Sequence, residues 1–374
     1  IGGTETYLRE LIAHLPQLAD DTEIVLLVPQ EVAGVFADSP LRVVSVPHSL
    51  RRIAALRFME AAFANFHATS IERIIADVEP DAILYPQQSM FPKRAPCASV
   101  VIIHDLYHLT FPTYCSRLQH WFRNRTYPAA VANADRVIAV SEVTKRSVIE
   151  HYGCDPQRIE VVWHGIRQLS PDKITPSDLV SGPYLYYPAV TLPHKNHQLL
   201  FRSIARLRDQ GRFPYRLVLT GAKSKHWPQL EKEIQSLSLQ EIVLHLGYVS
   251  YGTVLSLMRG AESLVFPSRC EGFGIPVIEA AMLERKMITS QLDVFAEIGV
   301  PDAYRIDFAD ATALERALHD TTPPRLLREP STWLDCARET VAVLTQTARE
   351  HASMNRLSLP GKMIAASEPQ RRSA

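Results

Sequence analysis

A glycine-containing turn in the second half of the chain has the composition of an anion-binding loop. The apolar segment SLVFP (263–267) predicts a strand, SRCEGFG (268–274) predicts a loop, and Pro276 marks the first turn of a helix. Gly272 and Gly274 let backbone amides approach a ligand closely. The N–H groups and the dipole at the helix N-terminus attract an anion such as a diphosphate. This stretch therefore predicts a phosphate-binding turn.

Two glutamates accompany this turn, Glu271 in the loop and Glu279 near the start of the helix. A carboxylate beside a diphosphate would repel it. Neutral hydroxyl groups are better partners, because a carboxylate is a strong hydrogen-bond acceptor. The two glutamates are therefore candidates for binding a sugar and a ribose. The alternatives are a loop charge for Glu271 and a helix-dipole contact for Glu279.

A lysine and a histidine follow two other apolar segments. Lys195 lies in PHKNH (193–197), where the chain enters a helix, and its amine can neutralise a leaving diphosphate. His104 ends VVIIH (100–104), and an imidazole there can bind a sugar hydroxyl or polarise the reacting region. A solvated lysine and a histidine bound to backbone are the alternatives. Asp105 could orient the imidazole or cap the next turn.

The elements that must position these residues alternate along the chain. Short β-branched runs predict strands at 24–28, 42–46, 82–85, 99–104, 136–141, 159–163, 184–187, 215–221, 242–247, 263–267 and 287–290. Helical patterns lie between many of them, including 4–15, 54–77 and 143–151. Apolar strands separated by helices predict parallel sheets covered on both faces. We expect two doubly wound α/β domains, whose ligands lie beyond the carboxyl ends of the strands in the cleft between them.

Breaks in the alternation predict the domain boundaries. Residues 1–168 form a first Rossmann-like domain, and 169–182, rich in proline and serine, form a linker. Residues 183–330 form a second Rossmann-like domain. A terminal helix within 331–359 is expected to pack back toward the first domain, and the polar segment 360–374 is expected to be disordered.

The opening IGGTETYLRELIAHL predicts a glycine-rich turn that enters a helix over 4–15. A strand normally precedes such a turn. We therefore expect the first strand of this domain to lie upstream of Ile1, in a part of the native chain that is missing here.

Composition excludes several classes of protein. Lys plus Arg and Asp plus Glu both total 40, so the whole molecule offers no basic surface to nucleic acid. The five cysteines are scattered and lack metal-binding spacing, which suits a reducing compartment. Apolar runs are strand-sized, and no signal peptide is visible. We expect a cytoplasmic protein without a metal site.

The string PSRCEGFGIPVIEAAM (267–282) resembles the E-x7-E signature of retaining glycosyltransferases of the GT-B fold, in particular glycosyltransferase family 4. It departs from the usual family pattern by one extra alanine before the methionine and by LERKM (283–287) after the helix. The resemblance implies that Glu271 contacts the donor sugar near the reacting carbon and that Glu279 binds the ribose. It also assigns four neighbouring residues to the nucleotide-sugar site: Gly272, Phe273, Gly274 and Ile275.

Other segments resemble the same family. PHKNH resembles the segment that places Lys195 at the diphosphate, although the arginine that many relatives carry just before it is absent. His104 resembles the histidine that contacts the donor sugar. Gly2 and Gly3 resemble the glycine-rich loop facing the phosphates or the acceptor. Glu297 lies where the family often has a glutamate.

The resemblance implies transfer of a hexose to a glycan or a lipid-linked saccharide with retention at the anomeric carbon, without a metal or another cofactor. GDP-mannose is the first expectation for the donor, and UDP-sugars are alternatives. A nucleotide-sugar epimerase, a phosphorylase and a catalytically silent binding protein are the rival functions.

Two amphipathic segments, 48–68 and 115–127, combine arginines with aromatic residues. They suggest a basic, apolar surface for a lipid-linked acceptor or for the inner face of an anionic membrane. Ordinary helices packing on a sheet are the alternative.

Overall fold

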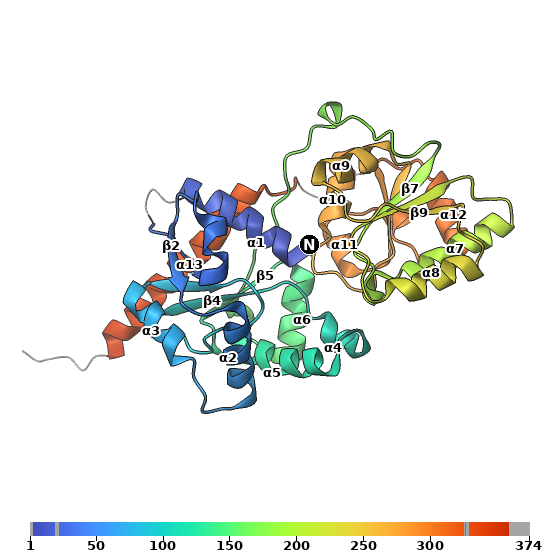
Figure 1. Cartoon of the computed structure of the whole chain (residues 1–374). Coiled ribbons are helices and arrows are strands. Elements are labelled where there is room, and N and C mark those ends of the chain that lie inside the picture. Colours follow the sequence, from blue (N-terminus) through green and yellow to red (C-terminus); the bar gives the residue numbers. More distant parts are fainter. Residues whose placement is uncertain (1–2, 19–21, 325, 327–328, 359–374) are drawn as a thin grey trace, which may run out of the picture.

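The computed structural model of the chain describes residues 3–18, 22–324, 326 and 329–358. Gly2 and the predicted polar tail at 360–374 lie outside these residues. Figure 1 shows two lobes joined by an extended segment. The first lobe contains the N-terminal elements together with the last helix, and the second contains the elements between them.

All strands pair in parallel. The strands of the first lobe are β1 (Val25–Pro29), β2 (Arg42–Val46), β3 (Ala82–Tyr85), β4 (Ala98–Ile103), β5 (Arg136–Ala139) and β6 (Ile159–Val161). Those of the second lobe are β7 (Tyr184–Pro188), β8 (Arg216–Thr220), β9 (Val243–His245), β10 (Ser263–Phe266) and β11 (Lys286–Thr289). Each of the strands predicted from the sequence is present, with ends that differ by a few residues.

The helices cover the sheets. In the first lobe they are α1 (Gly3–His14), α2 (Leu50–Ala62), α3 (Thr69–Val78), α4 (Tyr107–Thr110), α5 (Arg117–Asn133), α6 (Glu142–Tyr152) and the terminal α13 (Trp333–Ser358). In the second lobe they are α7 (His197–Asp209), α8 (Trp227–Ser236), α9 (Tyr251–Gly260), α10 (Ile275–Met282), α11 (Asp293–Glu297) and α12 (Ala311–His319). Helix α13 packs against α1, β3 and β4, so the end of the chain contributes to the first lobe.

The helix predicted over 54–77 is wrong, because the structure has two helices there, α2 and α3. The carboxylate of Glu60 explains the break. It is buried and accepts hydrogen bonds from the backbone of Ala68 at 2.8 Å and of Lys93 at 3.0 Å. These contacts fix the extended segment after α2, where a continuous helix would satisfy its N–H groups internally.

The sheet of the second lobe has the strand order β11-β10-β7-β8-β9. From β7 the chain builds outward through β8 and β9, then returns to the other side of β7 with β10. The order therefore reverses between β7 and β10. In an open parallel sheet the loops after such a pair of strands diverge and leave a crevice, which is the usual ligand site.

The strands of the first lobe form two ladders, β1-β2 and β3-β4-β5-β6. All six residues of β4 are buried, as expected for a central strand covered on both faces. Its carboxyl end leads directly to His104.

Candidate active site

The loops that follow β7 and β10 are tied together at the reversal point of the second sheet. The backbone N–H of Arg269 donates to the carbonyl of His194 at 2.8 Å. The side-chain amide of Asn196 donates to the carbonyl of Pro267 at 3.2 Å, and the Tyr187 hydroxyl donates to the carbonyl of Lys195 at 2.7 Å. These bonds hold the PHKNH segment against the SRCEGFG segment, which the sequence separates by about 75 residues.

Lys195 and Glu271 meet where these two loops touch. The Nζ atom of Lys195 lies 2.5 Å from Oε1 of Glu271, and the exposed fractions of the two side chains are 18% and 12%. The Lys195 amine also lies over the ring of Phe266, 5.5 Å from its centroid. A partly desolvated pair of this kind offers a cation to a phosphate and an acceptor to a hydroxyl within one small volume.

The SRCEGFG loop ends in the turn that starts α10. Gly274 caps the helix with φ 109° and ψ 48°, a left-handed conformation that favours glycine. A Cβ at Gly274 would lie 3.1 Å from the ring of Phe295, so close packing also favours glycine there. Pro276 has no N–H, and the N–H groups of Val277 and Ile278 donate to the carbonyl of Gly274 at 2.9 and 3.4 Å. The positive end of the α10 dipole therefore remains as the feature of this turn that attracts an anion. This arrangement has the chemistry of an anion-binding site.

Glu279 is buried four residues into α10, with 6% of its surface exposed. Burial raises the pKa of its carboxyl to about 7, while a hydrogen bond from the Tyr251 hydroxyl and the charge of Arg167 oppose that rise. The Tyr251 hydroxyl lies 2.6 Å from Oε1 of Glu279. The Arg167 guanidinium stacks on the Tyr251 ring at 4.7 Å and pairs with Glu10 of α1. No sequence motif points to Tyr251, Arg167 or Glu10, because they come from three distant segments.

Replacing Glu279 by glutamine is expected to change how stability depends on pH. A carboxyl with a raised pKa in the folded state binds more protons folded than unfolded. Its contribution to stability is therefore present below its ordinary pKa of 4.5 and is lost as the pH rises to about 7. Glu279→Gln should thus gain stability over the natural chain across this range, by up to about 3 kcal/mol. Thermal unfolding between pH 4 and pH 8 measures the difference.

The matched control is Glu231→Gln, which changes an exposed glutamate of α8. Its unfolding temperature should follow that of the natural chain at every pH. If the unfolding temperatures of Glu279→Gln and the natural chain differed by the same amount at every pH in this range, the raised pKa of the Glu279 carboxyl would be contradicted.

The SRCEGFG loop packs directly on the first lobe at Gly272. A Cβ at this position would overlap the carbonyl oxygen of His104 and would approach the side chain of Val140 to 3.4 Å. The Thr144 hydroxyl lies 3.5 Å from the carbonyl oxygen of Gly272. Only glycine allows the loop to lie this close to the carboxyl ends of β4 and β5.

The imidazole of His104, whose carbonyl oxygen makes this contact, is buried and 5% exposed. Its Nε2 is 3.0 Å from the carbonyl oxygen of Pro86, so Nε2 carries the proton. Its Nδ1 accepts from Nε2 of His164 at 3.3 Å. Burial lowers the pKa of His104 to about 4, which keeps the ring neutral at physiological pH. Both ring nitrogens are thus occupied by protein groups in this structure, and the ring also packs on Tyr7.

The remaining residues of the predicted site have different positions. The ring of Phe273 is 3% exposed and packs between Trp163 and His164 of the first lobe, with each pair of centroids 5.3 Å apart. Ile275 packs against the core of the second lobe. Gly3 begins α1, and Gly2 lies outside the described residues.

Glu297, at the end of α11, joins the two lobes. Its carboxylate accepts from the backbone N–H groups of Glu142 at 2.8 Å and Val143 at 3.0 Å, the first two residues of α6. It also accepts from the indole N–H of Trp163 at 3.1 Å. A carboxylate at a helix N-terminus is stabilised by unpaired N–H groups and by the helix dipole. The glutamate therefore caps a helix of the opposite lobe.

Replacing Glu297 by glutamine is expected to loosen the contact between the lobes. The amide keeps one acceptor oxygen but turns its NH₂ group toward a backbone N–H. The loss should be about 1.5–3 kcal/mol in the free energy of lobe association, the range for hydrogen bonds to charged groups. Small-angle scattering should show a larger radius of gyration. Asp293→Asn is the control, because the nearby Arg146–Asp293 pair is exposed and contributes little. A radius unchanged in both variants would show that Glu297 does not hold the lobes together.

Aromatic and basic side chains of both lobes meet beside Lys195. The rings of Tyr107 and His194 stack at 5.0 Å, and burial lowers the pKa of His194 to about 4. Arg269 donates to the Tyr114 hydroxyl at 2.9 Å and lies over the ring of Phe111. These contacts connect α4 and the segment after it to the two loops that carry Lys195 and Glu271.

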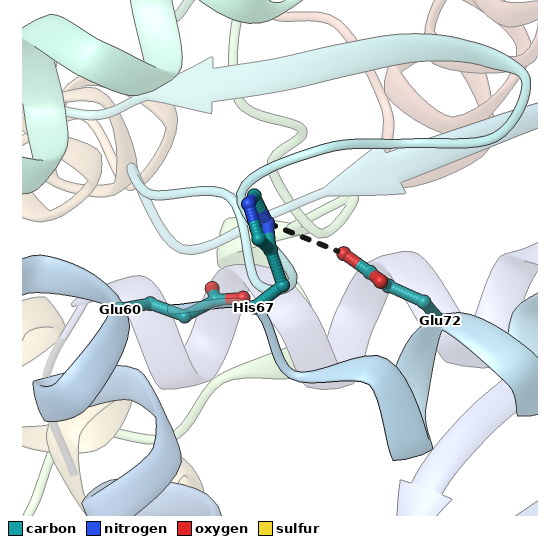
Figure 2. Close-up of side chains that lie close together, drawn as sticks. All are labelled: Glu60, His67 and Glu72. Carbon is teal, nitrogen blue, oxygen red and sulfur yellow. Dashed lines mark ion pairs between the residues drawn. The ribbon is translucent and has the colours of Figure 1, made fainter. Parts of the chain in front are cut away.

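One group of potential metal ligands occurs among the described residues, and it lies in the first lobe away from Lys195 and Glu271. The ligand atoms of Glu60, His67 and Glu72 lie within 4.8 Å of one another (Figure 2). Both oxygens of Glu60 already accept backbone hydrogen bonds, and His67 pairs with Glu72 at 3.9 Å. These contacts account for the group as part of the α2–α3 connection.

None of the helices in the described ranges has the length and apolar character needed to cross a bilayer.

Comparison with protein families gives two matches that together cover most of the chain. Residues 1–167 match the family described as Glycosyltransferase Family 4, and residues 177–322 match the family described as Glycosyl transferases group 1. The boundary between the matches falls within the segment that joins the lobes. The family matches therefore agree with the resemblance found in the sequence.

Curated relatives are similar at low identity. The chain is 25% identical over 222 residues to the O-antigen chain mannosyltransferase RfbU of Salmonella typhimurium, covering 58% of this chain and 59% of that protein. It is 23% identical over 263 residues to O-antigen chain mannosyltransferase B of Escherichia coli, covering 65% and 69%. The match thus spans less than two thirds of the length of RfbU.

Solved structures share the fold over nearly the whole chain. Anabaena Alr3699/HepE, solved in complex with UDP and glucose, superposes with a TM-score of 0.61 at 16% identity and covers 95% of this chain and 96% of that one. WaaG, a glycosyltransferase involved in lipopolysaccharide biosynthesis, has a TM-score of 0.59 at 14% identity, with 95% and 96% covered. These likenesses establish the two-domain GT-B architecture.

Proposed function

Because this chain belongs to the family 4 glycosyltransferases, we propose that it transfers a hexose from a nucleotide-sugar donor to a hydroxyl of a glycan or a lipid-linked saccharide, with retention at the anomeric carbon. The observation that carries the proposal is the Lys195–Glu271 pair at the reversal point of the second sheet. It lies beside the N-terminus of α10, where a diphosphate would be stabilised.

In the proposed reaction the donor diphosphate lies against α10 and Lys195. Glu271 accepts from a hydroxyl of the donor sugar, and Glu279 accepts from the ribose. The bond between the anomeric carbon and the diphosphate oxygen breaks as the acceptor oxygen bonds to that carbon. The acceptor proton leaves with the diphosphate, whose charge the Lys195 amine and the helix dipole stabilise.

Two residues need a change of partner when the donor binds. Lys195 and Glu271 neutralise each other in this structure, so phosphate and sugar must replace their direct contact. His104 has both ring nitrogens occupied, so we propose that it contributes by fixing the end of β4 beneath the donor loop rather than by exchanging a proton. The reaction as proposed uses no metal.

Mannose from GDP-mannose is the donor that we propose to test first. The support is the similarity to O-antigen chain mannosyltransferases and to the MMP alpha-(1->4)-mannosyltransferase of Mycolicibacterium hassiacum. UDP-sugars are the second choice, because Alr3699/HepE was solved with UDP-glucose. For its location, we propose that the enzyme is cytoplasmic and associates peripherally with a membrane.

The test is turnover across a panel of nucleotide sugars, with and without a saccharide acceptor. Release of nucleoside diphosphate together with a glycosylated product supports the proposal. An isomerised donor without such a product would identify an epimerase, and binding without any turnover would identify a silent binding protein. Glu271→Gln in parallel connects any turnover to the proposed site.

A further inference from the structure

A cavity of about 200 Å³ lies in the first lobe between α2, α5 and the segment after β3. It lies outside the Lys195–Glu271 region. Its lining includes Arg57 of α2, Arg125 of α5 and Lys93, with Ser89 and Asn133 beside them. A single water needs roughly 10–15 Å³ of such space, so the cavity has room for a phosphate group.

The cations of this cavity lack counter-charges among the described residues. Arg57, Lys93 and Arg125 make no ion pair with a carboxylate there. The single carboxylate in the lining, Glu60, is used by the backbone of Ala68 and Lys93. Three positive side chains and one negative side chain leave a net charge of two positive units.

The cations are held in place by neutral groups. Arg57 donates to the Ser89 hydroxyl at 2.7 Å, and burial lowers its pKa. Arg125 donates through Nε to the carbonyl of Ala61 at 3.2 Å, and Lys93 donates to the carbonyl of Ala64 at 2.7 Å. Each guanidinium carries five N–H donors, so both arginines have donors left for a ligand. Half-buried cations without a counter-ion are costly, and a bound anion would remove that cost.

The same two helices, α2 and α5, also carry exposed apolar side chains. Rings of Phe58 on α2 and Trp121 on α5 contact each other with centroids 5.4 Å apart. Large exposed apolar side chains on or next to α2 and α5 are Leu50 (49%), Phe58 (41%), Met59 (37%), Phe63 (55%), Leu118 (61%) and Trp121 (39%). They account for half of the exposed large apolar residues of the described chain, which total twelve. Exposed aromatics beside arginines are typical of surfaces that enter the interface of an anionic bilayer.

We propose that this cavity binds the phosphate of an anionic phospholipid headgroup, while the exposed apolar side chains of α2 and α5, including the Phe58–Trp121 pair, contact the bilayer. The inference rests on the peripheral membrane association proposed above and adds a built site to it. The exposed rings of Phe58 and Trp121 on the two helices that line the cavity favour a lipid over a free phosphate, because a soluble ion makes no use of exposed rings. Helix α5 follows the Tyr107–Tyr114 segment that touches His194 and Arg269. Docking through α2 and α5 therefore holds the donor loops near the membrane surface, where a lipid-linked acceptor is presented.

The experiment is co-sedimentation of the full chain with vesicles of phosphatidylcholine alone or mixed with phosphatidylglycerol. The natural chain should bind the mixed vesicles and bind the neutral ones weakly. Arg57→Gln and Arg125→Gln should each weaken binding by about tenfold or more, the effect of losing a hydrogen bond to a charged group. Arg51→Gln changes an exposed arginine of the same helix, and it should lose only about fivefold, the effect of one surface charge.

Several outcomes overturn the proposal. If Arg57→Gln and Arg51→Gln reduced vesicle binding equally, the binding would be explained by general basic charge, and the cavity would not be a phosphate site. Binding of glycerol phosphate without vesicle binding would identify a soluble ligand. If both cavity variants are folded, as judged by their unfolding temperatures, and still bind vesicles as the natural chain does, the cavity is not the lipid site.

Turnover with a soluble acceptor separates this inference from the proposed function. It should be unchanged in the cavity variants, since they leave Lys195 and Glu271 intact. A chain that binds vesicles through the cavity but shows no turnover would refute the enzyme function alone.

Discussion

Replacing Lys195 by methionine is expected to lower kcat/KM by about 10²–10³-fold, the cost of removing one group that stabilises charge in the transition state. The amine lies 2.5 Å from Glu271 beside the N-terminus of α10, where the leaving diphosphate is proposed to lie. Methionine keeps the length and the apolar contact with Phe266 but removes the charge. Steady-state kinetics with the donor identified in the panel measures the effect.

The two partners should also depend on each other. Lys195→Met leaves the carboxylate of Glu271 without its cation, and Glu271→Gln leaves the amine without its anion. The double variant should therefore lose less than the two single effects combined. Lys225→Met, which changes an exposed lysine of the same lobe, is the control and should keep full activity. If the Lys195→Met variant had the same kcat/KM as the natural chain, the assignment of this pair to the donor site would be refuted.

Replacing Gly272 by alanine is expected to have the second large effect. The new Cβ would overlap the carbonyl oxygen of His104, which is held at the end of the fully buried strand β4. Because β4 cannot move, the loop must shift, and it carries Glu271 and Phe273 with it. A displacement of about 1 Å in a catalytic group costs on the order of 10²-fold in rate. The measurements are kcat/KM, the radius of gyration and the unfolding temperature.

Gly252 provides the matched control. It lies in α9 of the same lobe, and its nearest neighbour to an added Cβ would be the Ser250 hydroxyl oxygen at 3.9 Å. Gly252→Ala should keep full activity and should stabilise the helix by up to about 1 kcal/mol. If Gly272→Ala behaved in the same way, the contact between the SRCEGFG loop and β4 would not belong to the active conformation.

The elements of the fold were largely predictable because they depend on local patterns. Short β-branched runs identified the strands of both lobes, since such runs fit buried parallel strands wherever they occur. The helix over 54–77 failed for a non-local reason. Glu60 binds the backbone of Lys93, which is 33 residues away, and no pattern within the helix contains that contact.

Partnerships at the site were harder to predict than the residues themselves. The motifs identified Lys195 and Glu271 separately, and the reversal of strand order between β7 and β10 brings them together. Tyr251 and Arg167 were missed because a tyrosine and an arginine in isolation carry no signal, and only the fold brings them to Glu279. The side-chain direction of His104 was equally inaccessible, since it depends on Pro86 and His164.

By itself the sequence determined the α/β class, the strands, the glycine turn before α10 and the residue types available for donor chemistry. These are properties of short segments, where side-chain size, charge and backbone freedom act locally. The tertiary structure alone decided that Glu297 caps α6 of the opposite lobe, that Gly272 must be a glycine because His104 lies against it, and that α2 and α5 enclose a cationic cavity. Each of these depends on segments distant in the chain, whose approach is set by packing of the whole molecule.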